Sequence, residues 1–368
     1  MSEMKSNKKS RIGYIVAPDQ QAGGGMGRVK DYIIQGASII DTETQFVPLI
    51  TRNSSGVLSS FLLLLFCLLA IFWRRVTGRL AFVHANFGDK GSAVRKGLVV
   101  IFTRLIGGKV ILHLHAVSLE RQYDALSWPL QLLCSIPFRL ATVNVVLGHR
   151  WKQWLVEKLG IKASKVAVLT NGVPLPKAAD LDMNRDKSEV EILFLGNLME
   201  RKGVTDLIEA MALLDKELRF KMIFAGGGNL DLYREKVSSH GLSDRVQFAG
   251  WVNQVQAAAL VRNSDLLVLP SYEEGLPLVI LEALGMGTPV LCTPVGSIPE
   301  VLVHHDTAYF TPVGNASALA GSLAELIVNE TLRATLSKHG RAAYEAKFSL
   351  EVFMNNLVRI YRQHGIEV

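Results

Sequence analysis

Cysteine is scarce in this chain of 368 residues. The three cysteines, Cys67, Cys134 and Cys292, lie far apart in apolar runs, and the sequence has neither a Cys-x-x-Cys pair nor a His/Cys cluster. Disulfide frameworks and structural zinc sites need closely spaced ligands of this kind. The sequence therefore predicts a reduced, cytosolic protein with buried thiols and no structural metal.

Charged residues are also few, at 20% of the chain, and no stripe of Lys and Arg alternates with aromatic residues. Because no nucleic-acid-binding motif occurs either, we expect no nucleic-acid partner. The formal charge of +7 and a pI near 9.2 still imply a negatively charged partner. We therefore expect a phosphate-bearing ligand and a membrane surface.

The N-terminus lacks the long apolar run of a secretory signal. Met1 to Arg11 is polar and basic, and the apolar run Ile12–Ala17 is too short for a signal peptide. This pattern is again what we expect of a cytoplasmic protein.

Short apolar runs alternate with helical stretches along most of the chain. This order is typical of parallel sheets covered on both faces by helices, an α/β fold. The polar, Pro-containing segment 173–188 interrupts the order and indicates a linker between two doubly wound domains, 1–173 and 188–340. The predicted strands are Ile12–Ala17, Gln45–Ile50, Leu80–His84, Val110–His115, Val143–Leu147, Val166–Leu169, Val190–Leu195, Phe220–Phe224, Val246–Phe248, Leu266–Leu269 and Val290–Cys292.

The most informative stretch runs from Pro270 to Val290. The apolar strand before it ends at Pro270, an acidic loop follows, and Pro277 suits the first turn of a helix. The backbone amides from Gly275 to Leu278 would then point out of the helix start, where they can hold a phosphate.

Two carboxylates flank this anion site. Glu274 lies in the loop and Glu282 lies in the helix, with seven residues between them. Carboxylates do not bind phosphate, but they accept strong hydrogen bonds from sugar hydroxyls. A nucleotide-sugar fits both features, because it contains a ribose, a diphosphate and a hexose.

The stretch resembles the Glu-x(7)-Glu signature of retaining glycosyltransferases of the GT-B architecture, family 4 (group 1). The resemblance implies two Rossmann-like domains facing across a cleft, with a C-terminal helix in 341–368 packing back towards the N-terminal domain. It also implies that Glu274 lies near the donor sugar and Glu282 near the ribose. The amides of Gly275 and Leu276 would lie beside the diphosphate.

Two glycine turns follow predicted strands. The first, Ala22–Val29, is neither a P-loop nor a dinucleotide-binding Gly-x-Gly-x-x-Gly. It is either a flexible turn or a functional loop, and in the family a Gly-Gly turn here, matched by Gly24 and Gly25, borders the donor phosphates and the acceptor. The second turn is Phe224–Asn229. In the family that the sequence resembles, such a turn borders the base and ribose, which would place Gly226 there. Trp251, further on, either covers the base or belongs to the core.

The strand Val110–His115 ends in two histidines. Because side chains alternate along a strand, His113 and His115 lie on the same face. The family has a histidine near the donor sugar at the position of His115, so we expect this residue to reach the cleft. His113 is expected inside the sheet or lower in the pocket. A purely structural pair is the alternative, and no third ligand with metal-site spacing follows.

The segment Leu195–Gly203 resembles the family pattern Gly-Arg-Leu followed by Lys-Gly, whose cations neutralise the diphosphate. Lys202 matches the lysine, whereas Asn197 stands where arginine is usual. Asparagine can donate a hydrogen bond to phosphate but brings no charge. Either Arg201 supplies the missing charge or the donor is held differently; a solvated helix-start loop is the alternative.

The run Val57–Trp73 is almost entirely apolar. As a helix it would span roughly 25 Å, short of the ~30 Å that a hydrocarbon core needs. Crossing would also put the glycine loop and His115 on opposite sides of the membrane. We therefore expect a helix with one face in the bilayer and Arg74 and Arg75 at the headgroups. A wholly buried helix is the alternative.

Together these features predict a retaining hexosyltransferase that is peripheral on the cytoplasmic face of the membrane. It would move a sugar from a UDP- or GDP-sugar to a lipid-linked acceptor in surface polysaccharide or glycan synthesis. It would need no cofactor and no metal, because Lys202 and the helix amides neutralise the diphosphate. A nucleotide-sugar epimerase on the same frame and a non-catalytic, membrane-recruited binding subunit are the alternatives.

Overall fold

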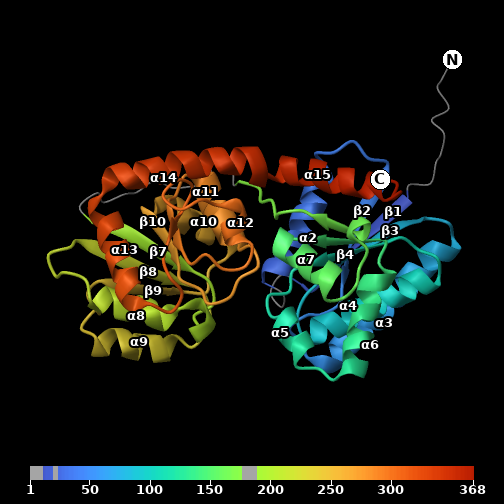
Figure 1. The fold of residues 1–368 in the computed structure, drawn as a ribbon, viewed down its shortest axis with the longest axis horizontal. Helices are drawn as coiled ribbons and strands as arrows, with labels where there is room; N and C mark the ends of the chain where they lie inside the picture. The colour runs from blue at the N-terminus through green and yellow to red at the C-terminus, as the bar shows by residue number, and fades with distance from the viewer. Residues whose placement is uncertain (1–10, 20–23, 176–188) are drawn as a thin grey trace, which may run out of the picture. The chain divides into compact units, whose positions relative to one another are not determined.

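The computed structural model of the chain describes residues 11–19, 24–175 and 189–368. The chain forms two compact units, each with its own six-stranded sheet whose paired strands are all parallel (Figure 1). The first unit comprises Met1–Asn171 and Leu350–Val368, and the second comprises Gly172–Ser349. The chain thus passes between the units near residues 171 and 349. These domain boundaries were predicted from the sequence at 173 and 340.

The sheet of the first unit has the strand order β2-β1-β3-β4-β5-β6. The chain places β2 on one side of β1 and β3 on the other, which is the reversal of order that defines a doubly wound sheet. The strands are β1 (Arg11–Ala17), β2 (Thr44–Ile50), β3 (Leu80–Phe87), β4 (Val110–Leu114), β5 (Val143–Val146) and β6 (Val166–Val168). The α-helices are α2 (Gly25–Gly36), α3 (Val57–Val76), α4 (Gly91–Leu105), α5 (Leu119–Asp124), α6 (Trp128–Leu140), α7 (His149–Glu157) and α15 (Leu350–Gln363).

Helices cover both faces of this first sheet (Figure 1). On one face α4 packs between α3 and α6, and on the other α15 packs against α2. Gly36 of α2 allows this second contact, because a Cβ there would lie 2.4 Å from the Met354 side chain of α15. The C-terminal helix is therefore a layer of the first unit.

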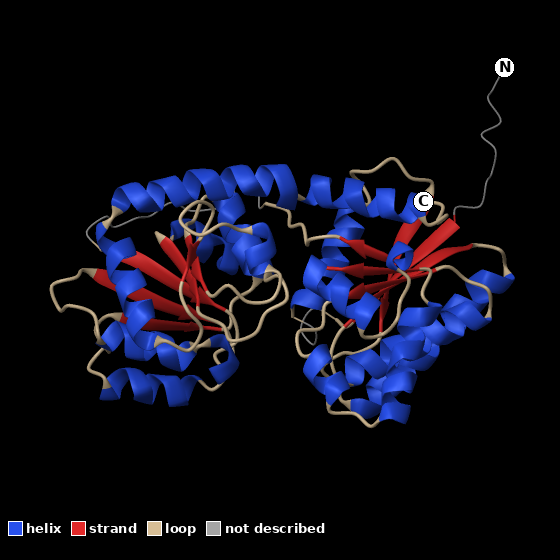
Figure 2. Cartoon of the chain, viewed as in Figure 1, coloured by secondary structure: helices blue, strands red, loops and turns tan. Residues whose placement is uncertain are grey.

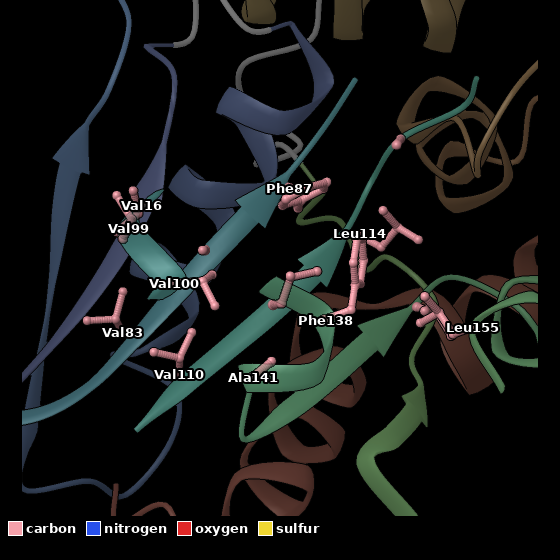
Figure 3. Close-up of a cluster of buried hydrophobic side chains, with 14 of the residues drawn as sticks. Val16, Val83, Phe87, Val99, Val100, Val110, Leu114, Phe138, Ala141 and Leu155 are labelled. Carbon is pink, nitrogen blue, oxygen red and sulfur yellow. The ribbon is translucent and has the colours of Figure 1, made fainter. Parts of the chain in front are cut away.

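The core of the first unit lies between β3, β4 and the helices α4 and α6 (Figure 3). Val83, Val99 and Val110 are fully buried, and burial of each such side chain contributes about 1.5–3 kcal/mol. Phe138 of α6 contacts Phe87 with their ring centroids 5.1 Å apart. This packing fixes the carboxyl ends of β3 and β4, where Phe87 and Leu114 lie side by side in the sheet.

The sheet of the second unit has the order β12-β11-β10-β7-β8-β9, with helices around its strands (Figure 2). Its strands are β7 (Val190–Leu195), β8 (Phe220–Ala225), β9 (Val246–Gly250), β10 (Leu266–Leu269), β11 (Val290–Cys292) and β12 (Tyr309–Phe310). Its α-helices are α8 (Val204–Ala212), α9 (Leu230–Ser239), α10 (Gln254–Asn263), α11 (Leu278–Met286), α12 (Ile298–Val301), α13 (Ala316–Val328) and α14 (Glu330–Ala343). The order reverses between β7 and β10, which places the loops that follow them next to each other.

The predicted doubly wound α/β fold is confirmed, and each predicted strand forms within a few residues of its expected bounds. The two-residue strand β12 was missed, because so short an edge strand has no readable periodicity. The expectation of buried thiols fails for Cys134, which is exposed on α6, whereas Cys67 and Cys292 are buried. Most of the predicted linker lies outside the described residues.

Helix α3 differs from its prediction in length and in exposure. It has 20 residues and includes Arg74, Arg75 and Val76, so it spans about 30 Å and the estimate of 25 Å was too short. By length and composition alone it could therefore cross a membrane. It is not a wholly buried helix either, since Val57 is 89% exposed and Trp73 63%.

Candidate functional site

The loops after β7, β8 and β10 meet at the carboxyl edge of the second sheet. A Cβ on Gly226 would lie 1.9 Å from the carbonyl oxygen of Gly196, and one on Gly203 would lie 2.1 Å from that of Pro270. Both glycines also have a positive backbone φ, 142° at Gly226 and 69° at Gly203, which residues with a side chain rarely adopt. These positions let the three loops touch through their backbones.

Lys202 and Glu274 form an ion pair across two of these loops. The Lys202 Nζ donates to Glu274 Oε1 at 2.5 Å, and the Ser271 hydroxyl donates to the same oxygen at 2.8 Å. Only 9% of Glu274 is exposed, and Ser271 is fully buried. Two predicted site residues are thus brought together in a shielded place, where an ion pair is stronger than at the surface.

Arg201 joins the same two loops by a second route. Its Nη1 donates to the carbonyl oxygen of Glu273 at 2.6 Å, and its own carbonyl accepts from the backbone N–H of Tyr272 at 2.9 Å. The Arg201 side chain is otherwise exposed, so the guanidinium remains accessible to a ligand at this edge.

The loop that leads into α11 is held from the other side by the segment after β11. The N–H of Ser297 donates to the carbonyl of Gly275 at 2.9 Å. Helix α11 begins at Leu278 with Pro277 as its N-cap, one position later than predicted, because Pro277 has the extended ψ of 128°. Leu276 and Glu282 are buried, and Glu282 lies in the second turn of the helix.

Two further predicted residues are open to solvent. Asn197 is exposed in the loop after β7, where the Leu198 N–H donates to Gly227 O at 2.7 Å and anchors the turn. Trp251, just after β9, is 71% exposed. The reading of Trp251 as a core residue is therefore wrong.

In the first unit, the glycine loop lies beside the carboxyl end of β3. Gly24 and Gly25 are exposed, α2 begins at Gly25, and nothing lies within 4 Å of a Cβ built on either glycine. The carbonyl of Met26 accepts from Asn86 of β3 at 3.5 Å. This loop therefore leaves open space at the edge where β3 ends.

His115 lies at the same edge. It follows the end of β4, its N–H donates to Phe87 O at 2.8 Å, and its side chain is half-buried. Its ring centroid is 4.1 Å from that of His113. Burial lowers the pKa of His115 to about 3, so at neutral pH the ring is an uncharged donor and acceptor.

A buried hydrogen-bonded chain leads from α15 to His113. The Tyr361 hydroxyl lies 2.5 Å from His84 Nδ1, and His84 Nε2 lies 3.2 Å from His113 Nδ1. If the Tyr361 hydroxyl donates to His84 Nδ1, both histidines carry their proton on Nε2, and His84 Nε2 donates to His113 Nδ1. The Nε2 of His113 is then a donor that has no hydrogen-bond partner in the described residues. His113 and His84 are fully buried, as was expected of His113.

Sequence reasoning missed several residues of these two edges. His84 and Tyr361 are separated by 277 positions, so no local pattern could pair them. Thr293 directly follows β11, Ser271 follows β10 after Pro270, and Thr293 Oγ1 donates to Ser271 O at 2.5 Å. A polar residue within two positions of the end of a buried strand was the signal that could have identified these two.

The described residues contain no group of three or more His, Cys, Asp or Glu side chains that could hold a metal ion. The sequence does contain an Asp-x-Asp, Asp180 to Asp182, which lies outside the described residues. A polar cavity of about 340 Å³ is lined by Arg219, Lys221 and Arg245 among others. It lies at the amino ends of the second sheet's strands, opposite the edge described above.

Comparison with known sequences identifies similarity mainly in the second unit. The family model of glycosyl transferases group 1 matches residues 181–343. The N-acetyl-alpha-D-glucosaminyl L-malate synthase of Bacillus anthracis is 32% identical over 176 residues, which are 48% of this chain and 46% of that protein. The chain spans about half the length of the first curated relatives it matches.

Two solved structures resemble nearly the whole chain. The sucrose-phosphate synthase of Thermosynechococcus elongatus has a TM-score of 0.77 at 19% identity and covers 96% of this chain and 98% of its own. HepE of Anabaena, solved in complex with UDP and glucose, has a TM-score of 0.75 at 16% identity and covers 96% and 99%. Residues 181–343 therefore resemble the glycosyl transferases of group 1, and the fold of the chain is GT-B.

Proposed function

We propose that the protein is a retaining hexosyltransferase that uses a UDP- or GDP-sugar donor. The Lys202–Glu274 pair supports this most directly, because it places a cation and a carboxylate together beside the start of α11. A cation beside helix amides suits a diphosphate, and a carboxylate suits the hydroxyls of a sugar. That HepE binds UDP and glucose on the same fold supports the choice of donor.

Catalysis would rest on stabilising the leaving diphosphate. Negative charge grows on the phosphate oxygen as the glycosidic bond breaks, so Lys202 and the N-terminal amides of α11 contribute more in the transition state than in the ground state. Arg201, accessible at the same edge, adds charge where Asn197 brings none. The diphosphate is thereby neutralised by the chain's own groups.

Glu274 would orient both the lysine and the sugar. Its Oε1 accepts from Lys202 and Ser271, which fixes the carboxylate so that Oε2 can accept from a donor hydroxyl. Glu282, buried in the second turn of α11, would hold the ribose. We propose same-face attack by the acceptor as the diphosphate departs.

The acceptor would be a lipid-linked glycan at the cytoplasmic face of the membrane. Helix α3 buries Ser60, Leu64, Cys67 and Ile71, which form one face at helical spacing. Its other faces expose large apolar side chains, which include Val57, Leu58, Phe61, Leu62, Leu65, Phe66, Leu69, Phe72 and Trp73. A helix packed on its own sheet by one face is suited to lie in the membrane surface, because crossing would remove it from that sheet.

Donor binding and transfer test the proposal in sequence. UDP or GDP should raise the midpoint of thermal unfolding, because a ligand that binds only the folded state stabilises it. A membrane extract incubated with the matching radiolabelled sugar nucleotide should then gain label in its lipid fraction. Interconversion of the nucleotide-sugar without transfer would instead indicate an epimerase, and the absence of nucleotide binding would contradict both enzymes.

A further inference from the structure

Lys96 is a buried lysine that has no carboxylate partner among the described residues. It lies in the second turn of α4 and is fully buried, and its Nζ makes one hydrogen bond, to Ser92 Oγ at 3.3 Å. Burial, together with the nearby charges of Arg95 and Arg52, lowers the pKa of Lys96 to about 7. Burying an ammonium group beside a single neutral partner costs free energy, and an anion bound next to it would offset that cost.

Two arginines lie close to this lysine. The Nη1 of Arg95 folds back over the first turn of α4, 3.3 Å from where a Cβ on Gly91 would lie. The Arg95 Nε is buried with no hydrogen-bond partner in the described residues. Arg52 follows β2, is exposed, and its charge contributes to lowering the pKa of both Arg95 and Lys96. Arg52, Arg95 and Lys96 are thus basic side chains whose charges act on one another.

The carboxylate in the loop that precedes α4 holds another loop. Asp89, between β3 and α4, accepts from the backbone N–H groups of Val117 and Ser118 at 3.1 and 3.2 Å, and so holds the loop that follows His115. In the part of the chain that the structure describes, none of the ion pairs includes Arg52, Arg95 or Lys96.

The cluster lies at the carboxyl edge of the first sheet. Arg52 follows the end of β2, and the Lys96 side chain reaches back towards the turn that follows β3. Ligands of doubly wound sheets bind at this edge, where His115 also lies. We propose that Arg52, Arg95 and Lys96 form an anion site that binds the phosphate group of a phosphorylated lipid, the acceptor of the reaction proposed above.

Exposed apolar side chains next to the cluster indicate that the phosphate belongs to a lipid. Helix α3 begins shortly after Arg52, and Asn53 ties this loop to the first turn of α3 by accepting from Ser55 N and Ser59 Oγ. In that turn Val57 and Leu58 are 89% and 74% exposed. A cationic site beside exposed apolar side chains complements a molecule with a phosphate and a hydrocarbon chain.

Binding of octyl phosphate, compared with inorganic phosphate, tests this inference, which rests on the proposed function. We expect the wild-type protein to bind octyl phosphate monomers more tightly than inorganic phosphate in isothermal titration calorimetry. Lys96→Met and Arg52→Gln should each weaken octyl phosphate at least about tenfold, because each removes a charge-assisted contact. Lys162→Gln, the same charge change at an exposed residue outside the proposed site, should leave it unchanged.

UDP binding by the same variants separates this inference from the proposed function. Lys96→Met and Arg52→Gln should bind UDP as the wild type does, since the proposed donor site lies in the second unit. UDP binding without octyl phosphate binding would overturn the anion site alone. Equal affinity for octyl phosphate and inorganic phosphate would overturn the assignment of a lipid ligand. An equal loss of affinity in Lys162→Gln would show that only the overall charge matters, and would overturn the anion site. Exposed Arg52 keeps the test valid if Lys96→Met does not fold.

Discussion

Lys202 and Glu274, separated by 72 positions in the sequence, form a shielded ion pair with Nζ and Oε1 2.5 Å apart. Sequence reasoning gave them separate tasks, the lysine on the diphosphate and the glutamate on the sugar. Their contact makes them one unit, because each side chain fixes the position of the other. A donor that binds here meets a cation and an acceptor oxygen already in place, which lowers the cost of ordering them.

The first prediction follows from this pairing. Lys202→Ala should lower kcat about 10²- to 10³-fold with a smaller rise in the donor KM, because the lysine acts mainly in the transition state. Glu274→Ala should cause a similar loss, and the double variant should lose far less than the two losses combined, since both break one unit. Steady-state kinetics of sugar transfer measures all three.

A matched control for this prediction is the exposed pair Arg234–Asp231, whose N–O distance is 3.1 Å. Arg234→Ala should leave kcat unchanged. Fully additive losses in the double variant would show that Lys202 and Glu274 act independently, and a raised KM with unchanged kcat would make Lys202 a binding residue only.

The second prediction concerns Asn197, exposed where the family has arginine. Asn197→Arg should tighten UDP binding about three- to tenfold, because a charge-assisted hydrogen bond to phosphate is worth roughly 1 kcal/mol more than a neutral one. The gain should shrink in high salt. Calorimetry with UDP measures the gain in affinity. Gln247→Arg, at an exposed residue of β9, is the charge-matched control. No gain would indicate that Arg201 already supplies the charge.

The third prediction concerns the buried histidines. Burial lowers the pKa of His84 to about 3 and that of His113 well below its ordinary value. Between pH 6.5 and about 3 the unfolded chain therefore binds protons that the folded chain does not. The free energy of unfolding should fall as the pH falls through this window, by up to about 1.4 kcal/mol per pH unit for each histidine.

Urea unfolding measured from pH 7 to pH 4.5 checks this dependence. His84→Gln should make the slope shallower, because it removes one group that titrates only in the unfolded chain. The same change at solvent-exposed His240 should leave the slope as it is. A slope that His84→Gln does not alter would place the acid sensitivity elsewhere in the chain.

The fourth prediction concerns helix α3 and the membrane. Leu62, Leu65 and Leu69 are 56%, 46% and 59% exposed, so replacing all three with Ser should release the protein from anionic liposomes without unfolding it. Sedimentation with liposomes measures binding, and circular dichroism monitors the fold. High salt should weaken wild-type binding only in part, because apolar contacts are not screened.

Leu64 and Ile71 provide the control on the opposite face of α3. They are 8% and 0% exposed, so Leu64→Ser and Ile71→Ser should destabilise the first unit by creating buried polar groups and cavities. A wild-type protein that ignores liposomes of every charge would contradict the peripheral location and leave a soluble acceptor.

The sequence by itself determined the parallel α/β layers, since most strands are buried apolar runs bounded by turn residues. It also located Glu274 and Lys202 in segments that follow strands, where doubly wound sheets bind ligands, and Glu282 in the helix after Glu274. Such patterns are local, because they depend on the spacing of apolar side chains along a few turns or strands. Helix ends were less certain, as the start of α11 and the length of α3 show.

Only the tertiary structure decided which of these residues meet. Lys202 contacts Glu274 because the sheet order makes β7 and β10 neighbours, and no spacing in the sequence encodes that order. The link between His84 and Tyr361 exists because α15 returns to the first unit. Lys96 reads as an ordinary helix lysine until packing removes it from water. Burial and partners are properties of the assembled chain, and they decide what each charge can do.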